Sequence, residues 1–106
     1  MLLRLTRVVF ADGRVEEAVP IFEARSSAIA AEPGCLAISF GRLPHDRRVG
    51  VAVSVWLDPA SHVAHEQTPA YAQFAQVVTQ RDLLAGPPDI QVLEATVFEL
   101  GRSAGA

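Results

Sequence analysis

The chain has 106 residues, half of them apolar, and carries nine arginines against twelve aspartates and glutamates, a formal net charge of −3. This length accommodates one domain with one packed core and excludes a two-domain enzyme with a separate cofactor module. The mild negative charge excludes a strongly basic nucleic-acid-binding surface. The sequence contains no lysine, which also excludes Schiff-base chemistry, pyridoxal phosphate attachment and a P-loop lysine.

Cysteine content and hydropathy predict where the protein resides. The single cysteine, Cys35, cannot form an internal disulfide or supply a multi-cysteine metal site, which favours a reducing compartment. Arg4 and Arg7 interrupt the N-terminal apolar run before a signal-peptide core could form. The longest strongly apolar stretch, residues 49–57, is far shorter than the roughly 20 residues of a membrane span. We therefore expect a soluble, cytoplasmic protein that binds neither nucleic acid nor a membrane.

The chain begins with a predicted strand and a predicted helix. Residues 2–10 are rich in Leu and Val and stop at a turn signal in residues 11–13. Apolar residues then recur at helical spacing over residues 15–29. Pro20 lies inside this pattern, so the helix is either kinked there or begins near Val19 with the proline in its first turn.

Two strands are predicted in the middle of the chain. The helix is expected to end at residues 33–34, where a glycine can adopt the left-handed conformation. Residues 35–41 alternate as a strand does, and residues 42–48 are expected to form a loop. Residues 49–57 are the clearest strand, because valines occupy alternate positions. The other face of that strand carries Gly50, Ala52, Ser54 and Trp56.

Two helix starts follow this strand. Asp58-Pro59 and Thr68-Pro69 each place an N-cap residue before a proline. They predict a short helix to about residue 67 and a second helix that closes near residues 84–88. Residues 90–100 are expected to form the last strand. The predicted domain is therefore 1–100, followed by a loose tail at 101–106.

This order of elements predicts an α+β fold of the ferredoxin-like, split βαβ type, with a four-stranded antiparallel sheet and helices on one face. The inner strands are apolar on both sides, and one layer of helices covers only one side. Monomers rarely expose an apolar patch of that size. We therefore expect a homodimer that packs sheet against sheet, with small residues at the contact: Cys35, Ala37, Ser39, Gly50, Ala52 and Ser54.

Reactive side chains gather between residues 56 and 71, where a strand end meets two helix starts and can frame a pocket. His65 is the candidate catalytic base, because an imidazole titrates near neutrality. The candidate substrate-binding residues are Trp56, Tyr71, Phe74 and His62. The three aromatic residues fit core packing equally well.

Helical periodicity alone argues against placing the two histidines in a binding or catalytic site. The more apolar stripe of the short helix, Ala60, Val63, Ala64 and Gln67, would turn His62 and His65 away from the core. No metal is expected, because His62, His65 and Glu66 lack a further ligand in good geometry.

The same region carries a family resemblance. Val53-Ser54-Val55-Trp56 is followed nine residues on by His65, then by Gln67-Thr68-Pro69 and the aromatic residues Tyr71 and Phe74. This pattern resembles the antibiotic biosynthesis monooxygenase (ABM) family, in its quinol monooxygenase-like branch. Pro33-Gly34-Cys35 matches that family's break between first helix and second strand, and the resemblance covers about residues 2–100. It implies a dimeric α+β barrel with a cavity between each sheet and its helices.

The resemblance also implies an activity. Some members oxygenate hydroquinones, naphthols or anthrones with O2 and without a metal or flavin cofactor. A base, here His65, would remove a phenolic proton, and the electron-rich anion would pass an electron to O2. A second branch degrades haem with an Asn, a Trp and a His. This sequence has no Asn and places His65 and Ala75 at the other two positions, so haem degradation is not expected.

Two other functions remain open from the residues. One is a non-catalytic dimer that binds a small ligand or serves in assembly. The other is an isomerase that acts on a small carbonyl compound with the same base and pocket.

Overall fold

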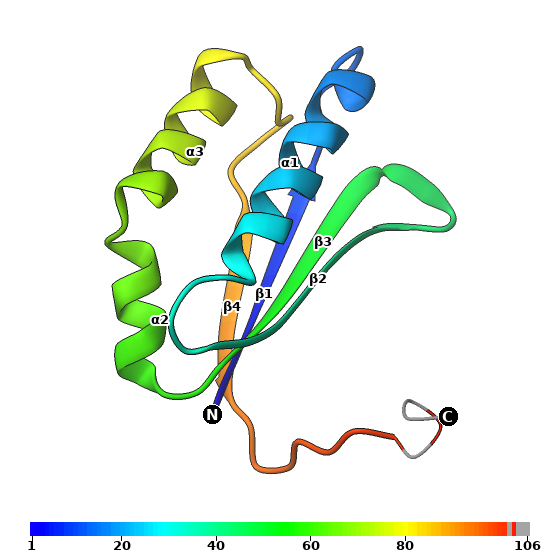
Figure 1. Cartoon of the computed structure of the whole chain (residues 1–106). Coiled ribbons are helices and arrows are strands. Elements are labelled where there is room, and N and C mark those ends of the chain that lie inside the picture. Colours follow the sequence, from blue (N-terminus) through cyan, green and yellow to red (C-terminus); the bar gives the residue numbers. More distant parts are fainter. Residues whose placement is uncertain (102, 104–106) are drawn as a thin grey trace.

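The computed structural model describes residues 1–101 and 103 (Figure 1). Its elements are β1 (Leu2–Val9), α1 (Val15–Ile29), β2 (Cys35–Leu43), β3 (Asp46–Trp56), α2 (Pro59–Glu66), α3 (Pro69–Gln80) and β4 (Asp89–Glu94). The strands form one sheet in the order β2-β3-β1-β4, and each neighbouring pair is antiparallel. This confirms the predicted ferredoxin-like α+β fold. The predicted tail at 101–106 lies largely outside the described residues.

The helices cover one face of the sheet (Figure 1). Register shows which side chains face them: Arg4 of β1 lies opposite Ser54 of β3, and Thr6 lies opposite Ala52. These residues line the space under the helices. None of the helices in the described part of the chain has the length and apolar character needed to cross a membrane.

An aromatic cluster joins α1 to the sheet and to α3. Phe22 of α1 packs edge-on against Phe10, with ring centroids 5.3 Å apart, and against Phe74 of α3 at 4.9 Å. Its ring also lies 5.9 Å from that of Phe40 in β2. Phe22 therefore links α1, α3 and the sheet through one side chain.

Helix α1 resolves the two alternatives that Pro20 left open. The helix begins at Val15 and continues through Pro20 to Ile29, so a start near Val19 is wrong. Both Pro20 and Glu16 are exposed, so the Glu16 carbonyl that loses its helical partner can bond to water instead. The predicted end at residues 33–34 is also wrong.

Gly34 lies in the loop between α1 and β2. Its φ of +81° favours glycine, and a side chain there would overlap Ser61 at the start of α2. This glycine therefore lets the loop approach the helix that carries the two histidines.

The loop predicted over residues 42–48 is replaced by a tight hairpin. Strand β2 continues to Leu43 and β3 begins at Asp46. The charged residues that suggested a loop are compatible with strands because Arg47 and Arg48 are exposed and Arg42 and Asp46 are only partly buried. The Asp46 carboxylate accepts bonds from the backbone and side chain of Arg48, at 3.2 and 3.3 Å.

The last strand is shorter than predicted, ending at Glu94 instead of residue 100. Its only neighbour in the sheet is β1. The Ala95 N–H donates to the Met1 carbonyl at 2.9 Å, directly after the last residue pair of the two strands, Leu2 and Glu94. The chain then leaves the sheet (Figure 1), with Val97 and Leu100 highly exposed.

The outer face of the sheet is lined by larger residues than predicted. Leu3 and Leu5 lie opposite Val55 and Val53 on this face, and Leu93 of β4 joins them. Ala37 and Ser39 pair with the same two valines, whereas they were expected on one face with Gly50, Ala52 and Ser54. The proposed contact residues Gly50, Ala52 and Ser54 are a wrong prediction, because they belong to the face under the helices, where the lining of the interior includes Ala52 and Ser54.

Candidate active site

Two capped helix starts position the site. The Asp58 carboxylate accepts from the Ser61 N–H at 2.8 Å, and the Thr68 hydroxyl accepts from the Tyr71 N–H at 3.1 Å. Both are the N-caps predicted from the sequence, each followed by a proline in the first turn. The caps fix α2 and α3 as separate helices, and α2 presents His62 and His65 to the interior.

Two adjoining cavities of about 90 and 190 Å³ lie between the sheet and the helices. Six residues line both of them: Arg4, Thr6, Val8, Phe22, Tyr71 and Phe74. Two predicted substrate-binding residues, Tyr71 and Phe74, thus lie in the shared wall. The wall combines aromatic and aliphatic surface with a few polar groups, as ligand pockets commonly do.

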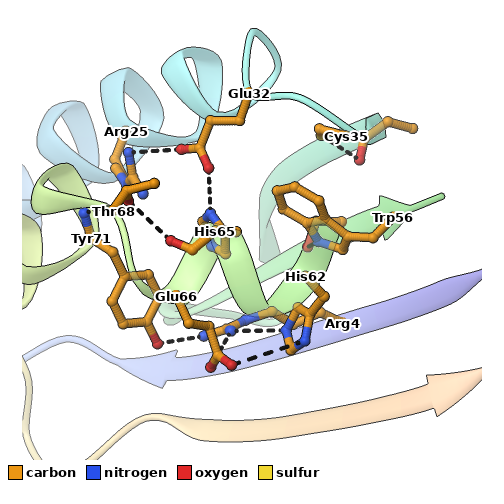
Figure 2. A network of polar contacts seen from close by, with 12 residues as sticks. Arg4, Arg25, Glu32, Cys35, Trp56, His62, His65, Glu66, Thr68 and Tyr71 are labelled. Atoms are coloured by element: carbon orange, nitrogen blue, oxygen red, sulfur yellow. Dashed lines mark hydrogen bonds and ion pairs between the residues drawn. The ribbon is translucent and has the colours of Figure 1, made fainter. Parts of the chain in front are cut away.

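His65 lines the smaller cavity and is only 4% exposed. Its Nδ1 lies 2.7 Å from Oε1 of Glu32, and the other oxygen of that carboxylate is 3.4 Å from Nη1 of Arg25 (Figure 2). The periodicity prediction for this helix is therefore wrong: both histidines are buried, and the stripe containing Val63 faces solvent.

The hydrogen bond to Glu32 determines which nitrogen of His65 can act. An ionised carboxylate only accepts, so Nδ1 carries the hydrogen. No hydrogen bond joins Nε2 to any group in residues 1–101 or 103. Burial lowers the pKa of His65, and this effect outweighs the opposing influence of Glu32. The ring is therefore neutral near pH 7, with an available lone pair on Nε2.

Trp56 supports His65 from the sheet. It is fully buried, its indole N–H donates to the Ser54 hydroxyl at 2.9 Å, and its ring centroid lies 4.6 Å from that of His65. Trp56 lies outside the lining of both cavities. The structure thus places it behind the candidate base.

Arg4 is the centre of a second polar network (Figure 2). Its Nη1 donates to Oε2 of Glu66 at 2.9 Å and lies 3.2 Å from Nε2 of His62, while Nη2 donates to the Tyr71 hydroxyl at 2.9 Å. A guanidinium has no acceptor, so Nε2 of His62 must accept. Burial lowers the pKa of His62, consistent with a neutral ring. His62 lies outside both cavity linings and holds Arg4 from behind.

Among residues 1–101 and 103, no group of three or more His, Cys, Asp or Glu side chains is close enough to hold an ion. The guanidinium of Arg4 faces His62, and a neighbouring cation opposes the binding of another.

Three functional candidates escaped the sequence analysis: Arg4, Arg25 and Glu32. For Arg4 a signal existed, since strand alternation places it on the same face as the buried Val8, where an arginine is unusual. Glu32 follows the end of α1 and gives no local signal. Only the folded chain brings it to His65.

Fold and site together define a small α+β domain with a mainly apolar interior cavity and a buried histidine in its wall. The family model for antibiotic biosynthesis monooxygenase matches residues 1–77, and the chain belongs to this family. The expected family is thereby confirmed. No curated protein matches the sequence.

Solved structures share the fold at low sequence identity. A Deinococcus radiodurans protein assigned to the same family superposes with a TM-score of 0.84 and 14% identity, over 95% of this chain and all of the other. One from Nitrosomonas europaea gives 0.83 and 15%, over 92% and 100%. SnoaB from Streptomyces nogalater, a cofactor-independent oxygenase, gives 0.77 and 18%, over 92% and 94%.

Proposed function

We propose that the protein is a cofactor-independent monooxygenase that oxidises an electron-rich aromatic compound, such as a hydroquinone, naphthol or anthrone, with O2. The observation that carries this proposal is the Glu32–His65 pair, which leaves a neutral imidazole nitrogen available at an apolar cavity. Membership of the monooxygenase family and the fold shared with SnoaB support it.

The chemistry begins with proton transfer from the substrate hydroxyl to Nε2 of His65, and Glu32 stabilises the imidazolium that results. The substrate anion passes one electron to O2, and the two radicals combine to form a carbon–oxygen bond. The peroxide then loses water. One oxygen atom stays in the product as a carbonyl, the other leaves as water with two substrate hydrogens, and the substrate supplies all the electrons.

The remaining candidate residues position the substrate, His65 and Arg4, and keep the cavity apolar. Phe74 and Phe22 supply flat apolar surface for the ring, and the Tyr71 hydroxyl orients a substrate oxygen. Trp56 limits the movement of His65, and His62 limits the movement of Arg4. Excluding water from this cavity protects the radical intermediates from side reactions.

Oxygen uptake tests the proposal directly. Purified protein is given reduced naphthoquinones and anthrones in the presence of a chelator, and the rates with heat-denatured protein are subtracted. We expect uptake that saturates with substrate, survives chelation and yields an oxidised product. Uptake no faster than with denatured protein across the whole panel would overturn the proposed activity.

The rate should fall with acid below the usual titration range of histidine. His65 must be neutral to accept a proton, and burial lowers its pKa from the ordinary value of about 6.5. The acidic limb of kcat/KM is therefore expected below pH 6.5. Because the Glu32 carboxylate raises the pKa of His65, Glu32→Gln should move that limb to still lower pH. If Glu32→Gln left the acidic limb of kcat/KM at the same pH, this result would contradict the proposed role of the Glu32–His65 pair.

We propose a homodimer that packs through the outer face of the sheet, where Leu3, Leu5, Val53 and Leu93 leave apolar surface uncovered by helices. Light scattering should give twice the 11.4 kDa chain mass. Val53→Glu should yield monomers, and Ala60→Glu, on the exposed side of α2, should stay dimeric. A monomeric wild-type protein at micromolar concentration would contradict this assembly.

We also propose a cytoplasmic location. Cys35 is a free thiol that is only partly buried. A thiol in this setting is kept reduced in the cytoplasm.

A further inference from the structure

The wall shared by the two cavities carries two hydrogen-bond donors side by side. Arg4 is 6% exposed and has five N–H groups, of which three donate through Nη1 and Nη2 to His62, Glu66 and Tyr71. The fourth, on Nε, reaches the Thr6 hydroxyl at 3.4 Å. One N–H on Nη2 remains, next to the Tyr71 hydroxyl.

Tyr71 completes the pair. Its oxygen accepts from Arg4 at 2.9 Å, so its own hydrogen is available to donate. The guanidinium carbon lies 5.4 Å from the centroid of the Tyr71 ring, which holds the two groups in a fixed relation. An oxygen-bearing ligand can therefore meet two donors that are already positioned.

The charge of the wall favours a negative ligand. Arg4 lines both cavities and Arg25 lines the smaller one, and no Asp or Glu of the described chain is among the lining residues of either. The carboxylates that bond these arginines lie outside the lining, and the side chain of Glu66 is 41% exposed to solvent. The remaining N–H of the buried Arg4 guanidinium has no hydrogen-bond partner among the described residues, and an anionic acceptor would give it a strong, charge-assisted hydrogen bond.

We propose that the substrate is an aromatic acid, a phenol whose carboxylate binds Nη2 of Arg4 and the hydroxyl of Tyr71. Arginine is charged at every working pH, so it selects a ligand that is already anionic. Near pH 7 a carboxylate meets this condition and a simple phenol, with a pKa near 10, does not. The inference rests on the proposed function only in taking this cavity as the substrate site.

The test is calorimetric binding, in the absence of O2 so that neither compound is oxidised, of two probes that differ by the carboxylate, 6-hydroxy-2-naphthoate and 2-naphthol. We expect the wild-type protein to bind the acid at least about tenfold more tightly, the usual scale for hydrogen bonds to a charged group. Arg4→Gln and Tyr71→Phe should each lose most of this preference while affinity for 2-naphthol changes little. Arg81→Gln, which removes an exposed charge after α3, should keep it.

Each outcome of the binding experiment supports or overturns the proposed acid site. Equal or tighter binding of 2-naphthol by the wild-type protein would overturn the proposal, as would a preference that survives both substitutions. Should circular dichroism show that Arg4→Gln is unfolded, Tyr71→Phe decides alone. A preference for the acid without oxygen uptake would overturn the oxygenase but not the acid site. Oxygen uptake with neutral substrates, without tighter binding of the acid than of 2-naphthol, would support the oxygenase and overturn the acid site.

Discussion

Replacing His65 with alanine is expected to lower kcat for oxygen uptake by about 10²–10⁴-fold, the usual contribution of a general base. The substitution removes the only histidine among the described residues that line the two cavities. It leaves the Arg4–Tyr71 pair in place, so aromatic ligands should still bind. The loss should therefore appear in kcat more than in KM.

The matched control is His45→Ala, in the exposed turn of the β2–β3 hairpin, which should leave kcat unchanged. Circular dichroism of both variants checks that the fold is retained. A His65→Ala variant that keeps the wild-type rate would remove the base from the mechanism. The oxygen chemistry would then depend on spontaneous ionisation of the substrate.

Replacing Phe22 with alanine is expected to lower the free energy of unfolding by about 3–5 kcal/mol, as deletion of a buried aromatic side chain usually does. Phe22 is 8% exposed and contacts Phe10, Phe40 and Phe74, and its loss would leave a void beside the cavities that it lines. Whole domains have a free energy of unfolding of only about 5–15 kcal/mol, so this substitution would remove a large part of it.

Urea denaturation followed by tryptophan fluorescence measures this effect, because Trp56 is the single tryptophan of the chain. Leu57→Ala removes an apolar side chain that is 55% exposed and should cost less than about 1 kcal/mol. If the two variants were equally stable, the aromatic cluster would not be the main link between α1, α3 and the sheet.

The elements that the sequence predicted well are those with local causes. Asp58-Pro59 and Thr68-Pro69 specify helix starts within four residues, and the alternating valines of β3 specify a strand without reference to the rest of the chain. These signals depend on the backbone conformation and hydrogen bonds of neighbouring residues. Both helix starts match the predictions, and β3 contains most of the predicted strand but begins three residues earlier, at Asp46.

Element ends were harder, because they depend on partners distant in the sequence. Strand β4 ends at Glu94, which pairs with Leu2 of β1, and the residues of β4 themselves give no sign of this register. Pro20 continues a helix because its turn faces water. A short window of sequence contains neither the pairing of β4 with β1 nor the solvent exposure of the turn at Pro20.

The orientation of the histidines was missed for the same reason. Hydropathy ranks His62 and His65 below alanine and valine, so the stripe with Val63 was taken as the buried side. Burial of an imidazole becomes favourable only when hydrogen-bond partners satisfy its nitrogens. Those partners, Arg4 and Glu32, lie 58 and 33 positions away in the chain.

The partition of the interior into two compartments with a shared wall has a consequence for divergence within the family. Residues that line only one compartment, such as Ile38 on one side and Val78 on the other, can change in size without altering the base or the anion-binding pair. Ring number and side-chain length of the substrate can therefore be selected separately from reactivity. Directed evolution toward a new aromatic substrate should begin at such positions and leave the shared wall intact.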